Sequence, residues 1–375
     1  MERRLNIASW ILVGLLLLPL LQHATGLVKE RKLKGAVTQA DVPRFKGENW
    51  WNMSYQDSLE TAMNDRFGFR NLFIRINNQV AFSFYRKALA SGVVIGKDNY
   101  MYERNYIKAY NGEDFVGDSV IRQNSETLKV LQDTLESRGK NFVVAFAAGK
   151  GSFYPEYFPD RYQMQPGRTN LAAYKDWFDR CGVNYIDFNA WFLQMKDTSR
   201  YILYPRTGVH WSYYGMVLVI DSLVNYLEKT SGHEMPVFNY YDIRESRKYR
   251  SSDKDIEDGM NIIFRVNRDK LAYPKVQFID ENVNKLKGVV IADSFYWGLH
   301  NIGFSSRIFD KGEYWYYNKR IIANHLDGPL ELDTIDRWQR LENVDVVMMM
   351  ATGATLPKFP FGIESIFDSA SISEE

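Results

Sequence analysis

The chain has 375 residues, long enough for one large domain with an extension or for two modest domains. Hydrophobic residues make up 45% of it, which supports a full core and argues against wholesale disorder. The formal net charge of +1 gives no excess that would indicate a nucleic-acid partner. A single cysteine, Cys181, excludes an intrachain disulfide, and the five histidines show no metal-binding spacing. No metal site and no cofactor are therefore predicted.

The N-terminus has the pattern of a targeting segment. Arg3 and Arg4 precede an apolar run from Ile7 to Leu21, which continues weakly to Val28. A basic start followed by such a run predicts a signal peptide or an uncleaved signal anchor over residues 1–28. We expect the rest of the chain to be exported and held at the cell membrane by this single transmembrane helix. The basic residues that follow the run outnumber those before it, which opposes the expected orientation.

Residues 29–90 form a membrane-proximal segment with a mostly helical pattern. Apolar residues recur at helical spacing from about Ser54 to Ala90, with a break at Gly68. Residues 91–375 contain the remaining predicted elements. Within them, residues 231–285 are polar and charged, which predicts an insertion or a solvated loop.

Beyond residue 90, apolar strand patterns alternate with helical patterns. A hairpin is predicted at residues 93–102, because two short apolar runs flank a Gly/Asp/Asn turn. Four further strands are predicted at residues 141–147, 184–188, 287–292 and 343–350, and helices at 120–137, 170–180 and 212–229. This alternation predicts an α/β fold with a mostly parallel sheet, in which functional sites form at the carboxyl ends of the strands.

Two segments far apart in the chain offer chemistry. Ser294 follows the predicted strand at residues 287–292, at a turn where backbone N–H groups could stabilise an oxyanion. His210 precedes the predicted helix at residues 212–229 and could act as the general base for a serine hydroxyl. Each residue also has a structural interpretation, because Ser294 could simply cap a helix and His210 could simply be packed.

The order of these segments resembles one branch of the SGNH hydrolase-like proteins. Residues 289–299 resemble the block that carries the nucleophilic serine of SGNH hydrolases. Residues 207–215, which read T-G-V-H-W-S-Y-Y-G, resemble the Asp-x-His-Trp-Thr-x-x-Gly block of the AlgX/AlgJ-like branch, itself related to DHHW-type proteins. In that branch the histidine block precedes the serine block, as it does here. Residues 64–70, 92–102 and 141–154 are similar to further segments of the family.

The resemblance implies a three-layer α/β/α, flavodoxin-like SGNH domain over residues 91–375, with a mostly parallel sheet. It also implies that Ser294 is the nucleophile and His210 the base. The acid of the family's histidine block falls on Gly208, so the group that would orient the histidine is absent from its usual place. Another carboxylate or a backbone carbonyl then holds His210, or the site is degenerate. Asp187, at the end of a predicted strand, is the substitute acid to test, and a purely structural role is its alternative.

These expectations lead to two hypotheses about function. In the first, the protein is an extracytoplasmic O-acyltransferase or esterase that moves an acetyl group on a cell-surface or exported polysaccharide, alongside a membrane-bound O-acyltransferase partner. The soluble domain would then lie in the periplasm or extracytoplasmic space. In the second, it is a catalytically weak or inactive glycan-binding or scaffold subunit of a polysaccharide-modification complex. The missing acid at Gly208 motivates the second hypothesis.

Overall fold

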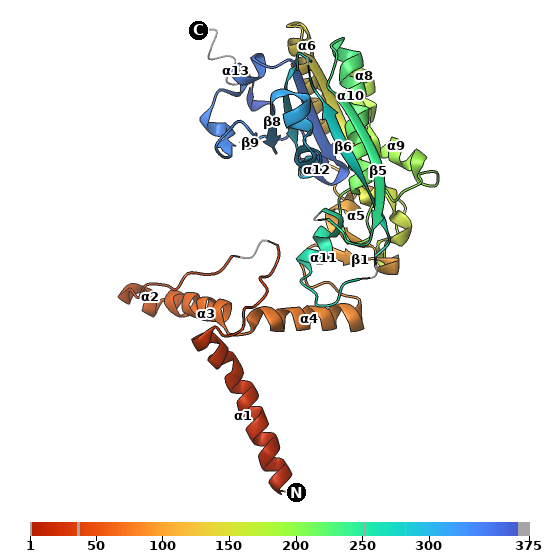
Figure 1. The fold of residues 1–375 in the computed structure, drawn as a ribbon. Helices are drawn as coiled ribbons and strands as arrows, with labels where there is room; N and C mark the ends of the chain where they lie inside the picture. The colour runs from red at the N-terminus through yellow and green to blue at the C-terminus, as the bar shows by residue number, and fades with distance from the viewer. Residues whose placement is uncertain (1, 36–37, 251, 267, 282, 367–375) are drawn as a thin grey trace. The chain divides into compact units, whose positions relative to one another are not determined.

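The protein, seen in a computed structural model, is described over residues 2–35, 38–250, 252–266, 268–281 and 283–366. It divides into two compact units (Figure 1). The first comprises Met1–Ser91 with Glu257–Val266, and the second Gly92–Ile256 with Asn267–Glu375. The residues that could carry chemistry lie in the second unit.

The first unit is built from helices. They are α1 (Glu2–Thr25), α2 (Gly47–Trp51), α3 (Ser54–Arg66) and α4 (Arg70–Tyr85). The break predicted at Gly68 therefore separates α3 from α4. Across the described part of the chain, no helix is both long and apolar enough to cross a membrane, so the structure does not support the predicted transmembrane anchor.

A segment from late in the chain completes the first unit. Asp258 pairs with Lys34 at 2.6 Å, and the side-chain oxygen of Gln79 on α4 accepts hydrogen bonds from the backbone of Ile263 and Phe264. These contacts join the early helices to residues 257–266.

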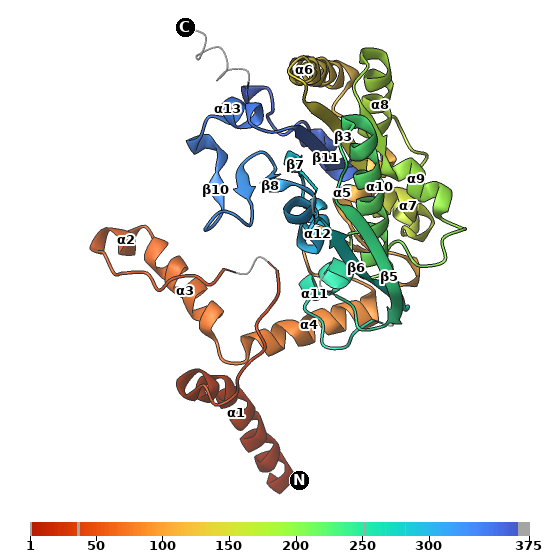
Figure 2. The same cartoon turned by 45° about the horizontal axis from the view of Figure 1, so that its top comes forward.

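The second unit is organised around a seven-stranded sheet in the order β10-β9-β8-β7-β11-β3-β4. Its strands are β3 (Asn141–Ala147), β4 (Tyr185–Asp187), β7 (Lys287–Ala292), β8 (Asp310–Tyr316), β9 (Arg320–Ile322), β10 (Leu330–Glu331) and β11 (Val346–Thr352). The strands from β8 to β4 are parallel, and β9 and β10 add an antiparallel edge. Figure 2 shows β8, β7, β11 and β3 side by side. The predicted α/β class with a mostly parallel sheet is confirmed.

Both faces of the central strands are buried, which explains their nearly continuous apolar sequences. On one face Val144, Ile291 and Met349 join a core with residues of α6 (Asp118–Glu136), α8 (Asn170–Cys181) and α13 (Arg337–Glu342). Alternate residues point to the other face and are buried as well, among them Val143 and Met348. Helices α10 (Tyr213–Ser231) and α12 (Tyr296–Ile302) pack against each other.

Smaller elements surround the sheet. The helices are α5 (Arg104–Asn111), α7 (Lys150–Phe153), α9 (Phe188–Met195) and α11 (Asp255–Gly259), and the predicted hairpin is β1 (Val93–Ile95) with β2 (Met101–Glu103). The stretch predicted as an insertion or solvated loop contains a regular pair of antiparallel strands, β5 (Val237–Ser246) and β6 (Leu271–Ile279). A bulge at residues 241–244 interrupts this pair.

Candidate active site

Ser294 lies in the turn that joins β7 to α12, at the carboxyl edge of the parallel sheet. The preceding residue, Asp293, fixes this turn. Its fully buried carboxylate accepts hydrogen bonds from the backbone of Phe295 and Thr352 at 2.9 Å and from the hydroxyl of Thr355 at 2.6 Å. The bond from Thr352 thus ties Asp293 to the end of β11. The half-buried Ser294 beside it lines a cavity of about 550 Å³.

His210 lines the same cavity, from the loop that leads into α10. Ser212 caps α10 by accepting a hydrogen bond from the backbone of Gly215 at 3.1 Å, and the fully buried Trp211 anchors the loop in the core. The imidazole of His210 lies against the ring of Phe295, the neighbour of Ser294, with 4.6 Å between ring centroids. The fold therefore brings the two predicted residues to one cavity. The hydrogen bonds among the described residues include none between them, and such bonds are often long in unliganded enzymes.

Asp255, at the start of α11, is the carboxylate that contacts His210. Its Oδ2 lies 2.5 Å from Nδ1 of His210. Its Oδ1 accepts hydrogen bonds from the backbone N–H groups of Val209 at 2.9 Å and Ile256 at 2.8 Å. Because both oxygens are engaged, the carboxylate has a fixed orientation and holds the imidazole through Nδ1, and no hydrogen bond among the described residues involves Nε2. This is the arrangement of the base and acid in a serine-based triad.

The structure also explains why the family's usual acid position is a glycine. A Cβ atom on Gly208 would lie 2.4 Å from the carbonyl oxygen of Ser252 and 2.8 Å from the carbonyl carbon of Asp253. The segment that carries Asp255 thus lies directly over Gly208. Thr207 ties the two together by donating a hydrogen bond to the carbonyl of Asp253 at 3.0 Å. A carboxylate side chain at position 208 would clash with residues 252–253, so the two cannot occur together. The segment over Gly208 instead contributes Asp255 as the acid.

Replacing Gly208 by alanine is expected to displace this segment and separate Asp255 from His210. We expect a loss of stability of about 1–3 kcal/mol, typical of overpacking, together with reduced turnover. Thermal unfolding and ester hydrolysis measure the two effects. Gly149→Ala is the matched control, because its Cβ would meet only Tyr106 at an ordinary 3.6 Å. Full activity in the Gly208 variant would contradict the role given to this close contact.

A buried lysine holds the histidine loop in place. Lys150, fully buried at the start of α7, donates hydrogen bonds from Nζ to the carbonyl oxygens of Gly208 at 2.7 Å, Met101 at 2.8 Å and Arg206 at 2.9 Å. Burial lowers the pKa of Lys150 well below its ordinary value, and nearby Asp255 opposes that shift. Lys150 thus connects the β1–β2 hairpin to the loop that ends at His210.

The protonation of His210 depends on Asp255. Burial alone lowers the pKa of His210, but the charge of Asp255 and its hydrogen bond outweigh this, so that the pKa lies above the ordinary 6.5. A general base must be neutral to accept a proton, so activity should rise as pH increases through this raised pKa.

Without the acid, the pKa of His210 should shift in the opposite direction. In Asp255→Asn the effect of burial dominates, and the pKa should fall below its ordinary value. Histidine-selective NMR titration tests this, with the other four histidines as internal references. Equal values for His210 in both proteins would contradict the coupling.

Asp187, the predicted substitute acid, lies in a different environment. Its Oδ2 pairs with Lys175 at 2.5 Å, and its Oδ1 caps α9 by accepting a hydrogen bond from the backbone of Ala190 at 3.0 Å. The structure therefore places Asp255, and not Asp187, against His210. No sequence pattern marks Asp255, which lies in the charged stretch interpreted as a solvated loop.

A tyrosine approaches Ser294 from the neighbouring strand. Burial raises the pKa of the Tyr317 phenol, just beyond β8, to about 12, and hydrogen bonding with Ser294 opposes this rise in pKa. Tyr314 and Trp315, which precede it, are fully buried and belong to the core. Tyr316 and Tyr317 are partly exposed and line a separate cavity with Phe361.

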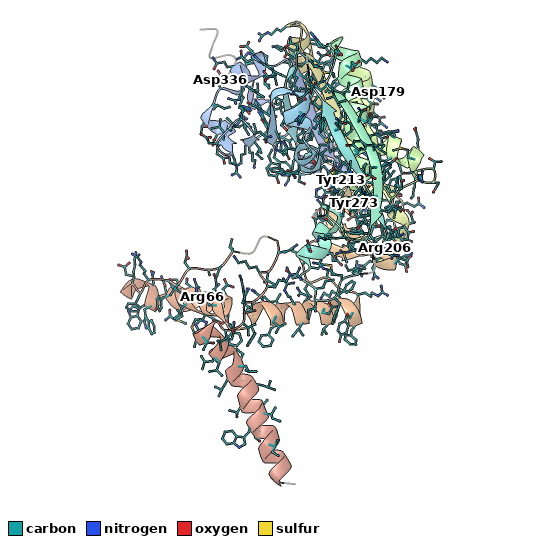
Figure 3. All side chains as sticks on the ribbon, viewed as in Figure 1. Arg66, Asp179, Arg206, Tyr213, Tyr273 and Asp336 are labelled. Atoms are coloured by element: carbon teal, nitrogen blue, oxygen red, sulfur yellow. The ribbon has the colours of Figure 1, made fainter. Side chains whose placement is uncertain are left out.

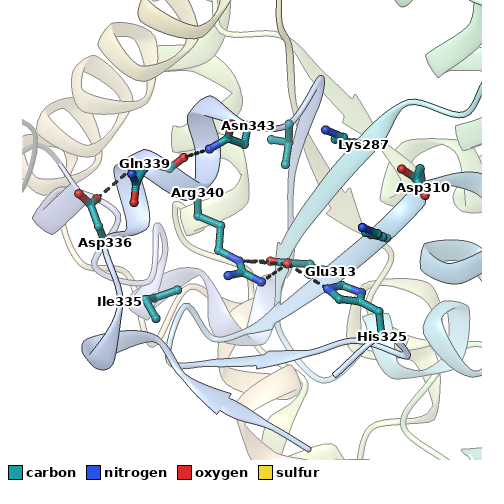
Figure 4. Close-up of a pocket in the computed structure, with 11 residues that line it drawn as sticks. Lys287, Asp310, Glu313, His325, Ile335, Asp336, Gln339, Arg340 and Asn343 are labelled. Atoms are coloured by element: carbon teal, nitrogen blue, oxygen red, sulfur yellow. Dashed lines mark hydrogen bonds and ion pairs between the residues drawn. The ribbon is translucent and has the colours of Figure 1, made fainter. Parts of the chain in front are cut away.

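Another cavity, shown in Figure 4, is dominated by an internally paired charge cluster. Both oxygens of the buried Glu313 accept hydrogen bonds from Arg340, and Glu313 also accepts one from Trp315 at 2.9 Å. Because these partners satisfy the hydrogen-bonding capacity of the carboxylate, we interpret the cluster as one that stabilises the fold. In the described part of the chain, no group of three or more His, Cys, Asp or Glu side chains could hold a metal ion.

Residues 93–244 match the family model described as "SGNH hydrolase-like domain, acetyltransferase AlgX". The predicted resemblance is confirmed over that range. It contains His210 and Gly208, whereas Asp255 and Ser294 lie beyond it. This part of the chain is therefore similar to the SGNH hydrolase-like domain of acetyltransferase AlgX.

The solved structures to which this chain is similar share little sequence with it. The O-acetyltransferase domain of Pseudomonas putida AlgJ is 16% identical, with 74% of this chain and 99% of that one covered and a TM-score of 0.47. Bacillus cereus PatB1 is 13% identical over 70% of this chain and 96% of that one, with a TM-score of 0.42. Pseudomonas aeruginosa AlgX is 12% identical over 70% of this chain and 55% of that one, with a TM-score of 0.40. A Dictyostelium discoideum protein described as "Probable polyketide synthase 5" is 26% identical over 112 residues, which is 30% of this chain and 4% of that protein.

Proposed function

We propose that this protein is an SGNH-like O-acyltransferase or esterase that moves an acetyl group on a cell-surface or exported polysaccharide, outside the cytoplasm. The observation that carries the proposal is the contact between Asp255 and His210 in the cavity lined by Ser294. It supplies the acid whose absence at Gly208 motivated the alternative of an inactive scaffold. The match to an acetyltransferase family supports the choice of acyl transfer as the reaction class.

In the first half-reaction, Ser294 attacks the carbonyl carbon of an acetyl donor. Nε2 of His210 takes the proton from Oγ as the new C–O bond forms, and Asp255 stabilises the resulting imidazolium through Nδ1. The donor's C–O bond then breaks, and His210 returns the proton to the leaving oxygen. The backbone N–H of Ser294 is the donor we assign to the oxyanion.

In the second half-reaction, a sugar hydroxyl or water attacks the acetylated Ser294. His210 removes the proton from this nucleophile, and the proton then passes to Oγ of Ser294 as the ester bond breaks. Transfer to a sugar gives an acetyltransferase, and transfer to water gives an esterase. The same three side chains serve both outcomes, so the acceptor decides between them.

Hydrolysis of p-nitrophenyl acetate by the purified protein tests the proposal. We expect Ser294→Ala to reduce the rate to the uncatalysed background, because the covalent intermediate cannot form without the hydroxyl. Ser306→Ala is a matched control, since its hydroxyl bonds only the carbonyl of Gly303 in the described contacts. Radiolabelled acetyl transfer to a panel of polysaccharides then separates a transferase from an esterase. Equal rates for the wild type and Ser294→Ala would contradict the enzyme and favour a scaffold.

A further inference from the structure

The boundary between the two compact units falls inside the short helix that carries the candidate acid. A 3₁₀ turn, Ser252–Lys254, leads directly into α11. Asp255 is the first residue of α11 and belongs to the second unit, whereas the same helix from Glu257 onward belongs to the first. The chain rejoins the second unit ten residues later. We call residues 257–266 the crossing segment.

Groups of the first unit hold the crossing segment by hydrogen bonds. Oδ1 of Asn261 accepts one from the backbone N–H of Lys34 at 2.8 Å, and its Nδ2 donates one to the carbonyl oxygen of Lys34 at 2.9 Å. On α4, Asn78 donates to the carbonyl oxygen of Met260 at 2.7 Å, and the side chain of Met260 is buried. Gln79 accepts from two backbone N–H groups of the crossing segment, at 3.0 and 2.8 Å. The crossing segment is therefore fixed to α4 and to the chain before it.

The start of the same helical stretch is held by the second unit. Oδ2 of Asp253 accepts hydrogen bonds from the backbone N–H of Arg250 at 3.1 Å and from the hydroxyl of Tyr273, labelled in Figure 3, at 2.7 Å. One turn of helix thus has its first residues attached to the second unit and its last residues attached to the first. Because helical hydrogen bonds make such a turn stiff, a displacement of its end is transmitted to Asp255.

We propose that the first unit positions the acid of the candidate active site, through Asn78, Gln79 and Asn261 acting on α11. The inference rests on the proposed function, in which Asp255 is the acid, and deepens it by giving the helical unit a part in catalysis. The three side chains are positioning residues, because they act through Asp255 and not on the reacting atoms. Such support matters because a catalytic group must be held to within about 0.5 Å of its productive position.

Asn261→Gly in the full chain is the variant that tests the inference. Asn261 has a φ of 52°, a conformation that glycine adopts without strain. The substitution therefore permits the same backbone course and removes the side-chain hydrogen bonds, including both to Lys34. We expect kcat for ester hydrolysis to fall by roughly tenfold, because a misplaced orienting group costs turnover. KM should change less than about twofold, since other residues line the cavity of Ser294.

The pKa of His210, followed by NMR titration, reports whether Asp255 has moved. Burial lowers this pKa, and the charge and hydrogen bond of Asp255 outweigh that effect. Asp293 and Glu103 also raise the pKa, and both are unchanged in the variant. A displaced Asp255 should therefore lower the pKa of His210 in Asn261→Gly toward its value in Asp255→Asn. A purely structural role for Asn261 would lower stability and leave this pKa unchanged.

The double variant Asn78→Ala with Gln79→Ala makes the same test from α4. It removes three hydrogen bonds to the crossing segment, and it keeps the inference falsifiable if Asn261→Gly does not fold. Asn77→Ala is the matched control, because this asparagine lies on the exposed side of the same helix. The control should leave both kcat and the pKa of His210 at their wild-type values.

Two outcomes overturn the inference. The first is a wild-type pKa of His210 in a folded Asn261→Gly and in the folded double variant. The second is an equal fall of this pKa in the Asn77→Ala control. Because the pKa is measured without substrate, a wild-type protein with no Ser294-dependent ester hydrolysis contradicts the proposed function alone. The titration still decides whether the first unit positions Asp255.

Discussion

Replacement of Asp255 by asparagine is expected to lower kcat for ester hydrolysis by roughly 10⁴-fold, the loss seen when a triad acid becomes an amide. Asparagine preserves the size of the side chain and can still accept a hydrogen bond from Val209. Its amide, however, donates to Nδ1 of His210, which forces the proton onto Nε2. The imidazole then cannot accept the proton of Ser294. The predicted change is therefore in kcat, with a small effect on stability.

Asp187→Asn provides the matched control for this experiment. It removes the same charge from a partly buried carboxylate whose contacts are Lys175 and the first turn of α9. We expect kcat to stay within a fewfold of the wild type. Stability should fall by less than about 1 kcal/mol, because asparagine caps a helix about as well as aspartate and only the partly exposed ion pair with Lys175 is lost. A large loss of kcat in Asp187→Asn with little loss in Asp255→Asn would reverse the assignment of the acid.

Lys150→Met is the second substitution for which a large effect is expected. It leaves the carbonyl oxygens of Gly208, Met101 and Arg206 without their shared donor. An unsatisfied buried acceptor costs about 1–3 kcal/mol, while removal of the buried ammonium relieves its desolvation penalty. We expect a net loss of roughly 3 kcal/mol in the free energy of unfolding, measured by urea denaturation. The loop before His210 should also lose its fixed position, which lowers kcat.

Lys140→Met separates the local effect from the loss of stability. Lys140 donates to two carbonyl oxygens, of Glu342 at 2.7 Å and Val344 at 2.8 Å, before the start of β3 at the other end of the sheet. Its loss should destabilise the protein without changing kcat below the unfolding temperature. If both lysine variants retain normal kcat when folded, Lys150 stabilises the domain and has no part in positioning His210.

Much of the fold could be predicted from the sequence because the central strands are buried on both faces. Continuous apolar runs placed β3 at residues 141–147 and β7 at 287–292, the bounds that the structure has. Amphipathic spacing located α6, α8 and α10 to within about two residues. The antiparallel edge, β9 and β10, was missed because these strands have only three and two residues. The strand β5 was missed because much of its surface is exposed and its second half is polar. The strand β6 is mostly apolar and its first four residues are buried, but it was grouped with the charged stretch around it.

The candidate site was only partly predictable, for a physical reason. Ser294 and His210 stand beside local signals, a strand end and a helix start, that single-sequence patterns reveal. Asp255 has no such signal: it reaches His210, 45 residues earlier in the chain, only because residues 252–255 fold over Gly208. Long-range contacts of this kind leave no spacing in the sequence. From the sequence, Gly208 indicated that the acid of the triad had been lost. In the structure, the missing side chain at Gly208 leaves room for the segment that carries Asp255.

The most direct test of the Ser294–His210–Asp255 arrangement is the rate at which phenylmethylsulfonyl fluoride modifies the protein, followed by peptide mass mapping. We predict one adduct, on the peptide that contains Ser294, formed rapidly in the wild type and far more slowly in His210→Ala and Asp255→Asn, because both variants lack an effective base. Modification of Asp187→Asn should proceed at the wild-type rate. An adduct at another residue, or equal rates in the wild type and Asp255→Asn, would contradict the account.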